Sequence, residues 1–205
     1  KLEDFVKVQT EGLDRQNKLL EQQSNRIKAV NEKVTEVLGT IVEYRHFESG
    51  NHIKRVKGFT RILAKKISQK YPEYNLTPER IEVISDASVL HDIGKIAVPL
   101  EILNKPTSLT NDEWRVMKSH VTKGYNIAQS SPVLRDIADE ILHHHEKWDG
   151  TGYPDGLKGD DIPLNSRIVS IVDSFDAMIS SRPYRENKSI KEAKDELVRC
   201  AGTQF

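Results

Sequence analysis

The octapeptide VLHDIGKI, residues 89–96, carries the strongest signal in this chain. His91 and Asp92 stand side by side in an otherwise apolar stretch, which predicts that both side chains are buried. Buried polar groups need partners. Neighbouring ligands can serve two adjacent metal ions when the carboxylate bridges them. The octapeptide therefore favours a buried metal site.

Three further segments combine histidines with carboxylates, or place a carboxylate in an apolar run. They are Glu48 with His52, the run His144-His145-Glu146, and Asp173 in IVSIVDSFDAM, residues 168–178. Glu48 and His52 are four residues apart at a predicted helix start, so both side chains project from one face and can reach one ion. One such group alone would be an ordinary surface pair or core carboxylate. Several in one small domain favour a site for more than one ion.

After residue 40 the apolar pattern is helical, with no convincing alternating run of the strand type. The chain is expected to be all-α, with helices over residues 51–71, 78–92, 110–130, 133–146, 163–180 and 188–200. Thr77 before Pro78, and Thr110 three residues before Glu113, are helix-start signals. Residues 148–164 contain four glycines and two prolines, which predicts a long loop, and such loops are typically functional.

Residues 1–42 carry an apolar repeat with a period of seven. The repeat positions are Val6, Leu13, Leu20, Ile27, Val34 and Ile41. The companion positions three residues on are Gln9, Gln16, Gln23, Val30, Val37 and Tyr44. This pattern predicts an N-terminal coiled-coil helix that forms a loose parallel homodimer and joins an upstream regulatory domain, such as a receiver or sensor, to the rest. The alternative is a long helix folded back on its own domain.

Composition excludes several classes of function. The 205 residues contain 31 Lys and Arg and 31 Asp and Glu, which disfavours binding to duplex nucleic acid. No apolar run approaches the ~18 residues that a membrane span needs. The single cysteine, Cys200, excludes an internal disulfide and fits a reducing compartment, so we expect a cytoplasmic protein.

Together the motifs resemble the HD-GYP domains, a branch of the HD phosphohydrolase superfamily that hydrolyses cyclic di-GMP. The matching segments are Glu48-Ser-Gly-Asn-His52 with Arg55, His91-Asp92-Ile-Gly-Lys95, Ile-Leu-Asn-Lys-Pro106, His120, His144-His145-Glu146-Lys-Trp148-Asp149-Gly150, Gly152-Tyr153-Pro154, Asp173-Ser-Phe-Asp176-Ala and Arg182-Pro-Tyr-Arg185. The resemblance covers residues 43–205 and implies an HD-superfamily helical bundle that stops short of the family's usual end. The family's usual Arg-Asp pair is Arg45-His46 here.

The resemblance also implies roles for individual residues. The metal ligands of the family fall on Glu48, His52, His91, Asp92, His120, His144, His145 and Asp173. Its phosphate and guanine contacts fall on Lys95, Tyr153, Arg182 and Arg185. Asp92 and Lys95 would act at the reacting phosphate, and Glu48 goes with members that hold a third ion.

Imidazoles and carboxylates without a thiolate favour iron or manganese over structural zinc. The eight ligands are too many for one ion and enough for two or three. Such ions share a bridging water, lower its pKa to ~7 and prepare it to attack a phosphodiester. With the resemblance, this chemistry implies hydrolysis of cyclic di-GMP to pGpG, and the final product, pGpG or GMP, stays open. Two alternatives stay open: a sister substrate such as cyclic GMP-AMP, and a non-catalytic interaction module.

Overall fold

The computed structural model describes residues 1–45, 51–132, 134–180 and 187–205. Glu48, Arg182 and Arg185 lie outside these ranges. Within them the secondary structure is helical, without a β-strand, so the prediction of an all-α chain is confirmed. The chain divides into two compact units, Lys1–Thr35 and Glu36–Phe205.

Helix α1, Leu2–Tyr44, is continuous through both units. In the first unit the apolar repeat is exposed: Val6, Leu13, Leu20 and Ile27 each have more than half of their surface open to solvent. Near the other end of α1, in the second unit, Gly39, Val42 and Glu43 are buried. The predicted boundary between residues 42 and 43 lies inside this helix. The coiled-coil dimer and the boundary both stay predictions.

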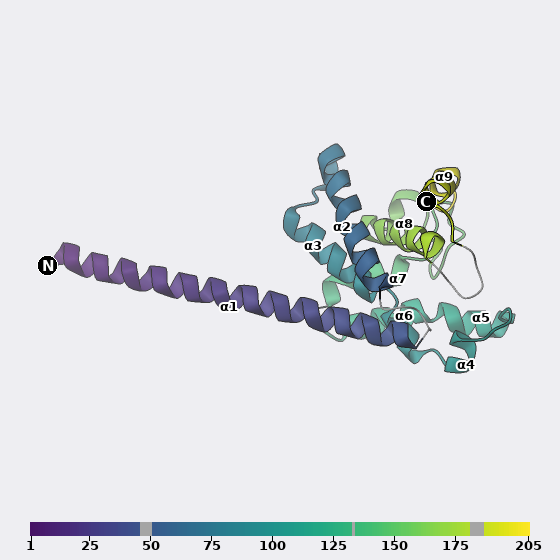
Figure 1. Cartoon of the computed structure of the whole chain (residues 1–205), viewed down its shortest axis with the longest axis horizontal. Coiled ribbons are helices and arrows are strands. Elements are labelled where there is room, and N and C mark those ends of the chain that lie inside the picture. The colour runs from purple at the N-terminus through teal and green to yellow at the C-terminus, as the bar shows by residue number, and fades with distance from the viewer. Residues whose placement is uncertain (46–50, 133, 181–186) are drawn as a thin grey trace. The chain divides into compact units, whose positions relative to one another are not determined.

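The second unit is built from short helices and turns. After α1 its α-helices are α2 (His52–Lys70), α3 (Pro78–Ala87), α4 (Leu100–Leu103), α5 (Asn111–Lys118), α6 (His120–Gln129), α7 (Ala138–His143), α8 (Leu164–Ile179) and α9 (Ile190–Arg199). Its 3-10 turns are η1 (Pro72–Tyr74), η2 (Ser88–Leu90), η3 (Ile93–Ala97), η4 (Arg135–Ile137) and η5 (Gly159–Asp161). Helix α2 packs against α3 and α8, and α9 lies along α8 (Figure 1).

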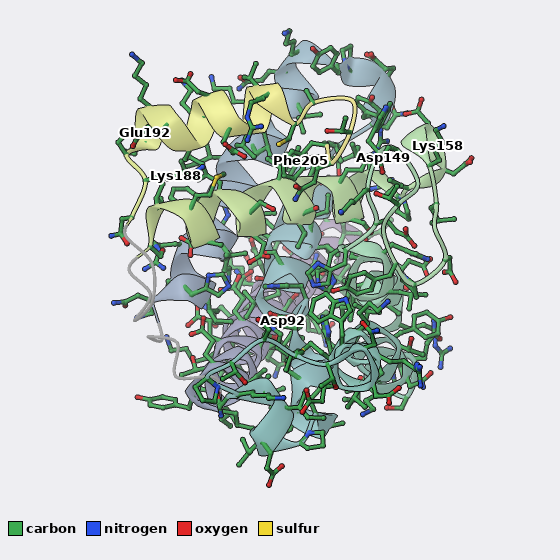
Figure 2. All side chains as sticks on the ribbon, turned by 90° about the vertical axis from the view of Figure 1, so that its right-hand side faces the viewer. Asp92, Asp149, Lys158, Lys188, Glu192 and Phe205 are labelled. Carbon is green, nitrogen blue, oxygen red and sulfur yellow. The ribbon has the colours of Figure 1, made fainter. Side chains whose placement is uncertain are left out.

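Two apolar clusters stabilise this unit. The first contains Val42, Ala87, Leu90, Ile93, Ala128, Ile137, Ala138 and Ile141. The second contains Ala64, Leu76, Ile81, Ile84 and Ile168. Leu90 and Ile93 flank the His91-Asp92 doublet, so burial of their side chains holds the two polar residues in the interior. Figure 2 shows Asp92 among the helices of this unit, with α8 and α9 to one side of it.

The predicted helix over residues 78–92 ends early, at Ala87; the 3-10 turn η2 follows over Ser88–Leu90, and η3 begins just beyond the predicted end, at Ile93. The Ser88 hydroxyl donates a hydrogen bond to the carbonyl of Ser85, and such local bonds compete with regular helix. Gly94 lets η3 pack closely on α6. A Cβ at Gly94 would lie 1.9 Å from the carbonyl oxygen of His120 and 2.5 Å from the amide nitrogen of Gly124. The turn therefore brings its backbone directly against α6, which a regular helix with side chains cannot do.

The prediction of a single helix over residues 110–130 is wrong. Helix α5 ends at Lys118 and α6 begins at His120. The Ser119 hydroxyl donates a hydrogen bond to the carbonyl of Val116, and such local bonds compete with regular helix. The helix expected over residues 133–146 is also shorter, because α7 ends at His143. Both breaks leave histidines at helix ends.

Among the described residues, we find no helix that combines the length and apolar character needed to cross a bilayer.

Candidate metal centre

Seven of the eight predicted ligands lie within the described residues, and they come from five separate segments. His52 begins α2 and His120 begins α6, whereas His144 and His145 follow α7. The remaining ligands are His91 and Asp92, between η2 and η3, and Asp173, within α8. Most of them therefore sit at helix ends, where the chain can direct side chains into one space.

The seven side chains form two groups of candidate metal ligands. Group A contains Asp92, His120, His144 and His145, and group B contains His52, His91 and Asp173. Within each group the ligand atoms lie within 4.8 Å of one another. The structure thus brings together every predicted ligand that it describes. Glu48, the eighth, falls outside the described residues.

Backbone carbonyls orient three of the imidazoles in the same way. The Nδ1 atoms of His91, His120 and His144 lie 2.7–2.9 Å from the carbonyl oxygen three residues earlier, those of Ser88, Met117 and Ile141. With Nδ1 donating to this carbonyl, the ring presents Nε2 with its lone pair. This arrangement is typical of histidines that bind metal.

Asp92 faces both groups. Its Oδ1 lies 3.2 Å from the Nε2 of His120 and its Oδ2 lies 3.3 Å from the Nε2 of His91. In group B, Asp173 lies near both imidazoles: its Oδ1 is 3.6 Å from His52 Nε2 and 3.7 Å from His91 Nε2. Asp92 is therefore placed to bridge two ions.

The described part of the site contains buried atoms without hydrogen-bond partners. They are Nε2 of His91, His120 and His144, and Oδ1 of Asp92. Leaving such atoms unpaired costs about 1–3 kcal/mol each. Three of these atoms belong to group A and Nε2 of His91 belongs to group B, which fits divalent metal binding, because a cation at each group would satisfy them.

The surroundings of the imidazoles shift their pKa values in opposite directions. Burial lowers the pKa of His144 well below its usual range and, together with neighbouring cationic groups, lowers that of His145 to about 3. Burial also acts to lower the pKa of His91, but the adjacent carboxylates of Asp92 and Asp173 raise it to about 9. Burial thus favours the neutral, metal-binding form of His144 and His145, whereas the neighbouring carboxylates favour the protonated form of His91 in the metal-free protein.

A residue to which we assigned no role from the sequence, Asp176, holds His52 in place. Its Oδ2 lies 2.7 Å from the Nδ1 of His52, and its Oδ1 accepts a hydrogen bond of 2.5 Å from the Nε of Arg55. Burial favours protonation of Asp176, but His52 and Arg55 outweigh it and lower the pKa to about 2. The spacing of Asp173 and Asp176 on α8 was an available signal, because side chains three apart share a helix face.

Lys95 lies beside the bridging carboxylate. Its Nζ donates a hydrogen bond of 2.6 Å to Oδ2 of Asp92, and both side chains are about four-fifths buried. Burial acts to raise the pKa of Asp92, but Lys95 and His91 keep it well below the usual range. The positive charge of Lys95 thus stands at the edge of the two groups.

The loop over residues 148–164 returns to group A and is held there by its own contacts. The backbone N–H of Tyr153 donates to the carbonyl of His145, and the two rings lie 4.9 Å apart between centroids. Glu146, which is buried, accepts hydrogen bonds from the backbone N–H groups of Asp155 and Gly156. This anchoring was not predicted from the sequence.

Gly152 is required for that close return. A Cβ there would lie 2.4 Å from the amide nitrogen of Lys147 and 2.5 Å from Cα of Glu146.

Of the four predicted substrate contacts, Lys95 lies beside Asp92 and Tyr153 lies against His145. Arg182 and Arg185 lie outside the described residues.

Comparisons with known proteins agree with this geometry. The family model of the HD domain matches residues 13–205. A cyclic di-GMP phosphodiesterase of Thermotoga maritima is 41% identical over 84% of this chain and 46% of its own length. A 3'3'-cGAMP-specific phosphodiesterase of Vibrio cholerae serotype O1 is 41% identical over 82% of this chain and 31% of its own. The chain thus spans less than half the length of these curated relatives.

The fold is shared with a solved structure. The crystal structure of a cyclic GMP-AMP specific phosphodiesterase of V. cholerae matches with a TM-score of 0.65 at 19% identity, covering 85% of this chain and 45% of that one.

Proposed function

This chain belongs to the HD domain family, and we propose that it is a metal-dependent phosphodiesterase that hydrolyses cyclic di-GMP. The observation that carries the proposal is the placement of Asp92 between two groups of candidate ligands. A pair of ions held by these two groups would suit in-line attack on phosphorus. The relatives' names supply the substrate class.

When bound, divalent ions would lower the pKa of an attacking water and neutralise phosphate charge. The residues of this chain position them. Group A would hold one ion through the imidazoles of His120, His144 and His145, group B would hold another through His52, His91 and Asp173, and Asp92 would contribute to both. The donors are imidazole nitrogens and carboxylate oxygens without a thiolate, so we favour iron or manganese. Glu48 would be a ligand of a third ion.

Substrate contacts are assigned to residues around this centre. Lys95 would place its ammonium against the phosphate or the leaving oxygen, since it already stands beside Asp92. Tyr153, half-buried against His145, would contact a base or sugar. Arg182 and Arg185 would bind phosphate through two hydrogen bonds each. The expected first product is pGpG, followed by GMP.

A second candidate substrate is 3'3'-cGAMP. It is favoured by the V. cholerae relative named for that substrate, which is as similar to this chain as the T. maritima protein named for cyclic di-GMP. A non-catalytic interaction module is less favoured, because none of the seven described ligand positions has been replaced.

The protein is further proposed to act in the cytoplasm as a homodimer joined through α1 and controlled by an upstream regulatory domain. The exposed apolar repeat of α1 supports the dimer.

The test uses metal-depleted protein reconstituted with Mn²⁺, or with Fe²⁺ under anaerobic conditions. Cyclic di-GMP and 3'3'-cGAMP are supplied separately, and the products are resolved by chromatography. We expect pGpG from cyclic di-GMP in the reconstituted protein and none in the metal-depleted protein. His143→Ala is the matched control, since His143 is not among the candidate ligands and pairs with the exposed carboxylate of Asp155; it should retain activity. Metal-loaded protein that cleaves neither dinucleotide would overturn the proposal.

A further inference from the structure

The last turns of α1 contain a buried carboxylate whose role the proposed function does not include. Glu43 is 5% exposed, although a glutamate near a helix end normally stays in solvent. Burial of a charged group costs free energy unless it is hydrogen-bonded or paired. A glutamate buried at this position therefore calls for a specific partner.

Glu43 contacts the start of α2. Its Oε1 accepts a hydrogen bond of 3.1 Å from the backbone N–H of Ile53, and this contact is buried. Ile53 directly follows His52, the first residue of that helix. Asn51, which precedes the helix, makes no side-chain capping bond. A carboxylate from α1 therefore contacts the first turn of α2, where a negative charge also complements the helix dipole.

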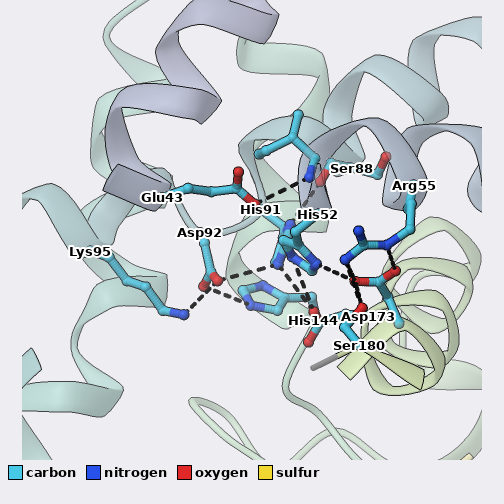
Figure 3. Close-up of polar contacts among 12 residues, drawn as sticks. Glu43, His52, Arg55, Ser88, His91, Asp92, Lys95, His144, Asp173 and Ser180 are labelled. Carbon is cyan, nitrogen blue, oxygen red and sulfur yellow. Dashed lines mark hydrogen bonds and ion pairs between the residues drawn. The ribbon is translucent and has the colours of Figure 1, made fainter. Parts of the chain in front are cut away.

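Glu43 also shares a small space with the metal centre. A cavity of about 20 Å³, roughly the room for one water, is bordered by Glu43, His52, His91, Asp92 and Lys95 among others. Figure 3 shows Glu43 on the side of His52 opposite Asp173. Asp176 thus fixes the imidazole of His52, and Glu43 fixes the backbone that carries it.

The same part of α1 packs closely on the segments that precede and follow the ligands. A Cβ at Gly39 would lie 2.8 Å from Cδ1 of Ile53 and 2.9 Å from the carbonyl oxygen of Val89. Ile53 follows His52 and Val89 precedes His91, so α1 touches both histidine segments of group B. A displacement of this end of α1 must move one or both segments.

We propose that Glu43 is a positioning residue of the metal centre, which makes the metal affinity of group B depend on how the end of α1 is seated. This inference rests on the metal centre of the proposed function but not on its substrate. Through Glu43, a change in α1 would reach the group B ion while the group A ion stays bound.

The experiment titrates the metal-depleted full chain with Mn²⁺, without substrate. Glu43→Gln keeps the size of the side chain and removes its charge. The matched control is Glu36→Gln, on the same face of α1, because Glu36 approaches Lys57, which lies beyond the first turn of α2, at 3.8 Å. His52→Ala identifies the binding step that belongs to group B.

In Glu43→Gln we expect the step that His52→Ala removes to weaken about tenfold, as loss of a group that orients a ligand commonly does. The other step should stay within about twofold, and Glu36→Gln should bind as the parent does. Hydrogen exchange of the metal-free protein should be faster at the start of α2 in Glu43→Gln only. If Glu43→Gln fails to fold, Gly39→Ala replaces it and should weaken the same step.

Parental Mn²⁺ affinity at both steps in Glu43→Gln would overturn the proposal, even with a lowered melting temperature. Equal weakening in Glu36→Gln would do the same, because it would show a general effect of α1 packing. A parent that binds Mn²⁺ in two steps but cleaves no cyclic dinucleotide would refute the proposed function and leave this test intact.

Discussion

The two groups of candidate ligands are held by different means. In group A the rings of His120 and His144 are oriented by carbonyls three residues earlier in their own segments. In group B the ring of His52 depends on Asp176, which α8 contributes from far along the chain. In group B the carbonyl of Ser88 orients His91 in the same way, so the difference between the groups lies in His52, whose Nδ1 partner comes from another helix. Changes outside the ligands should act mainly on group B.

Asp92→Ala breaks both groups at once and should have the largest effect. The substitution removes the carboxylate that faces His91 and His120, so we expect hydrolysis to fall roughly a thousandfold or more. The measurement is turnover together with metal content of the same preparation. Retained turnover in protein that still binds two ions would contradict a bridging role.

Asp176→Asn should weaken metal binding by group B and leave group A unchanged. It removes the charged partner of His52 and Arg55 and should destabilise the protein by about 3 kcal/mol, since breaking a buried pair leaves a charge uncompensated. Metal affinity of group B should fall by about tenfold to a hundredfold while group A is unchanged. Asp160→Asn is the control, because Asp160 pairs with Arg167 at the surface and should cost less than about 1 kcal/mol. Urea unfolding and metal titration measure both effects, and equal losses in the two variants would refute the distinction.

The pH dependence of unfolding tests the contribution of the Asp176 carboxylate to stability. The pKa of Asp176 is about 2 in the folded protein, below its unfolded value of about 3.9. Its contribution is therefore fully present above about pH 5 and is lost as the pH falls through about 2. It amounts to about 2.6 kcal/mol near neutral pH and roughly half of that at about pH 3. The stability gap between metal-free parent and Asp176→Asn should shrink accordingly in urea unfolding, and a gap that is constant with pH would contradict the pKa shift.

Tyr153→Ala touches neither group as a ligand and should have the smallest effect. The loop that carries Tyr153 is anchored by Glu146, so the metal content should stay parental. We expect KM to rise about fivefold, a loss of about 1 kcal/mol of binding. Loss of metal in this variant would mean that the tyrosine ring supports His145 rather than the substrate.

Much of the fold followed from local sequence signals. The helical pattern after residue 40 predicted an all-α chain, and Thr77 and Thr110 do cap α3 and α5. The helix ends before His91 and at His120 were missed, and so was the contact of Gly94 with the backbone of α6. That contact joins segments distant in sequence, and apolar periodicity does not report it.

The residues of the site also fall into those that the sequence predicted and those that it did not. The candidate ligands were recognised by residue type and motif, and the structure brings the seven described ones together. The supporting residues were not recognised, since Asp176, Glu146 and Glu43 are ordinary acids in the sequence. Each acquires its role only through a partner contributed by another part of the fold.

The most direct test of the central claim is anomalous diffraction from crystals of the Mn²⁺-loaded protein. We predict one peak within the side chains of Asp92, His120, His144 and His145, and a second within those of His52, His91 and Asp173, with Asp92 bound to both. A further peak beside Glu48 would add the third ion. A single peak, or two peaks without Asp92 between them, would contradict the account.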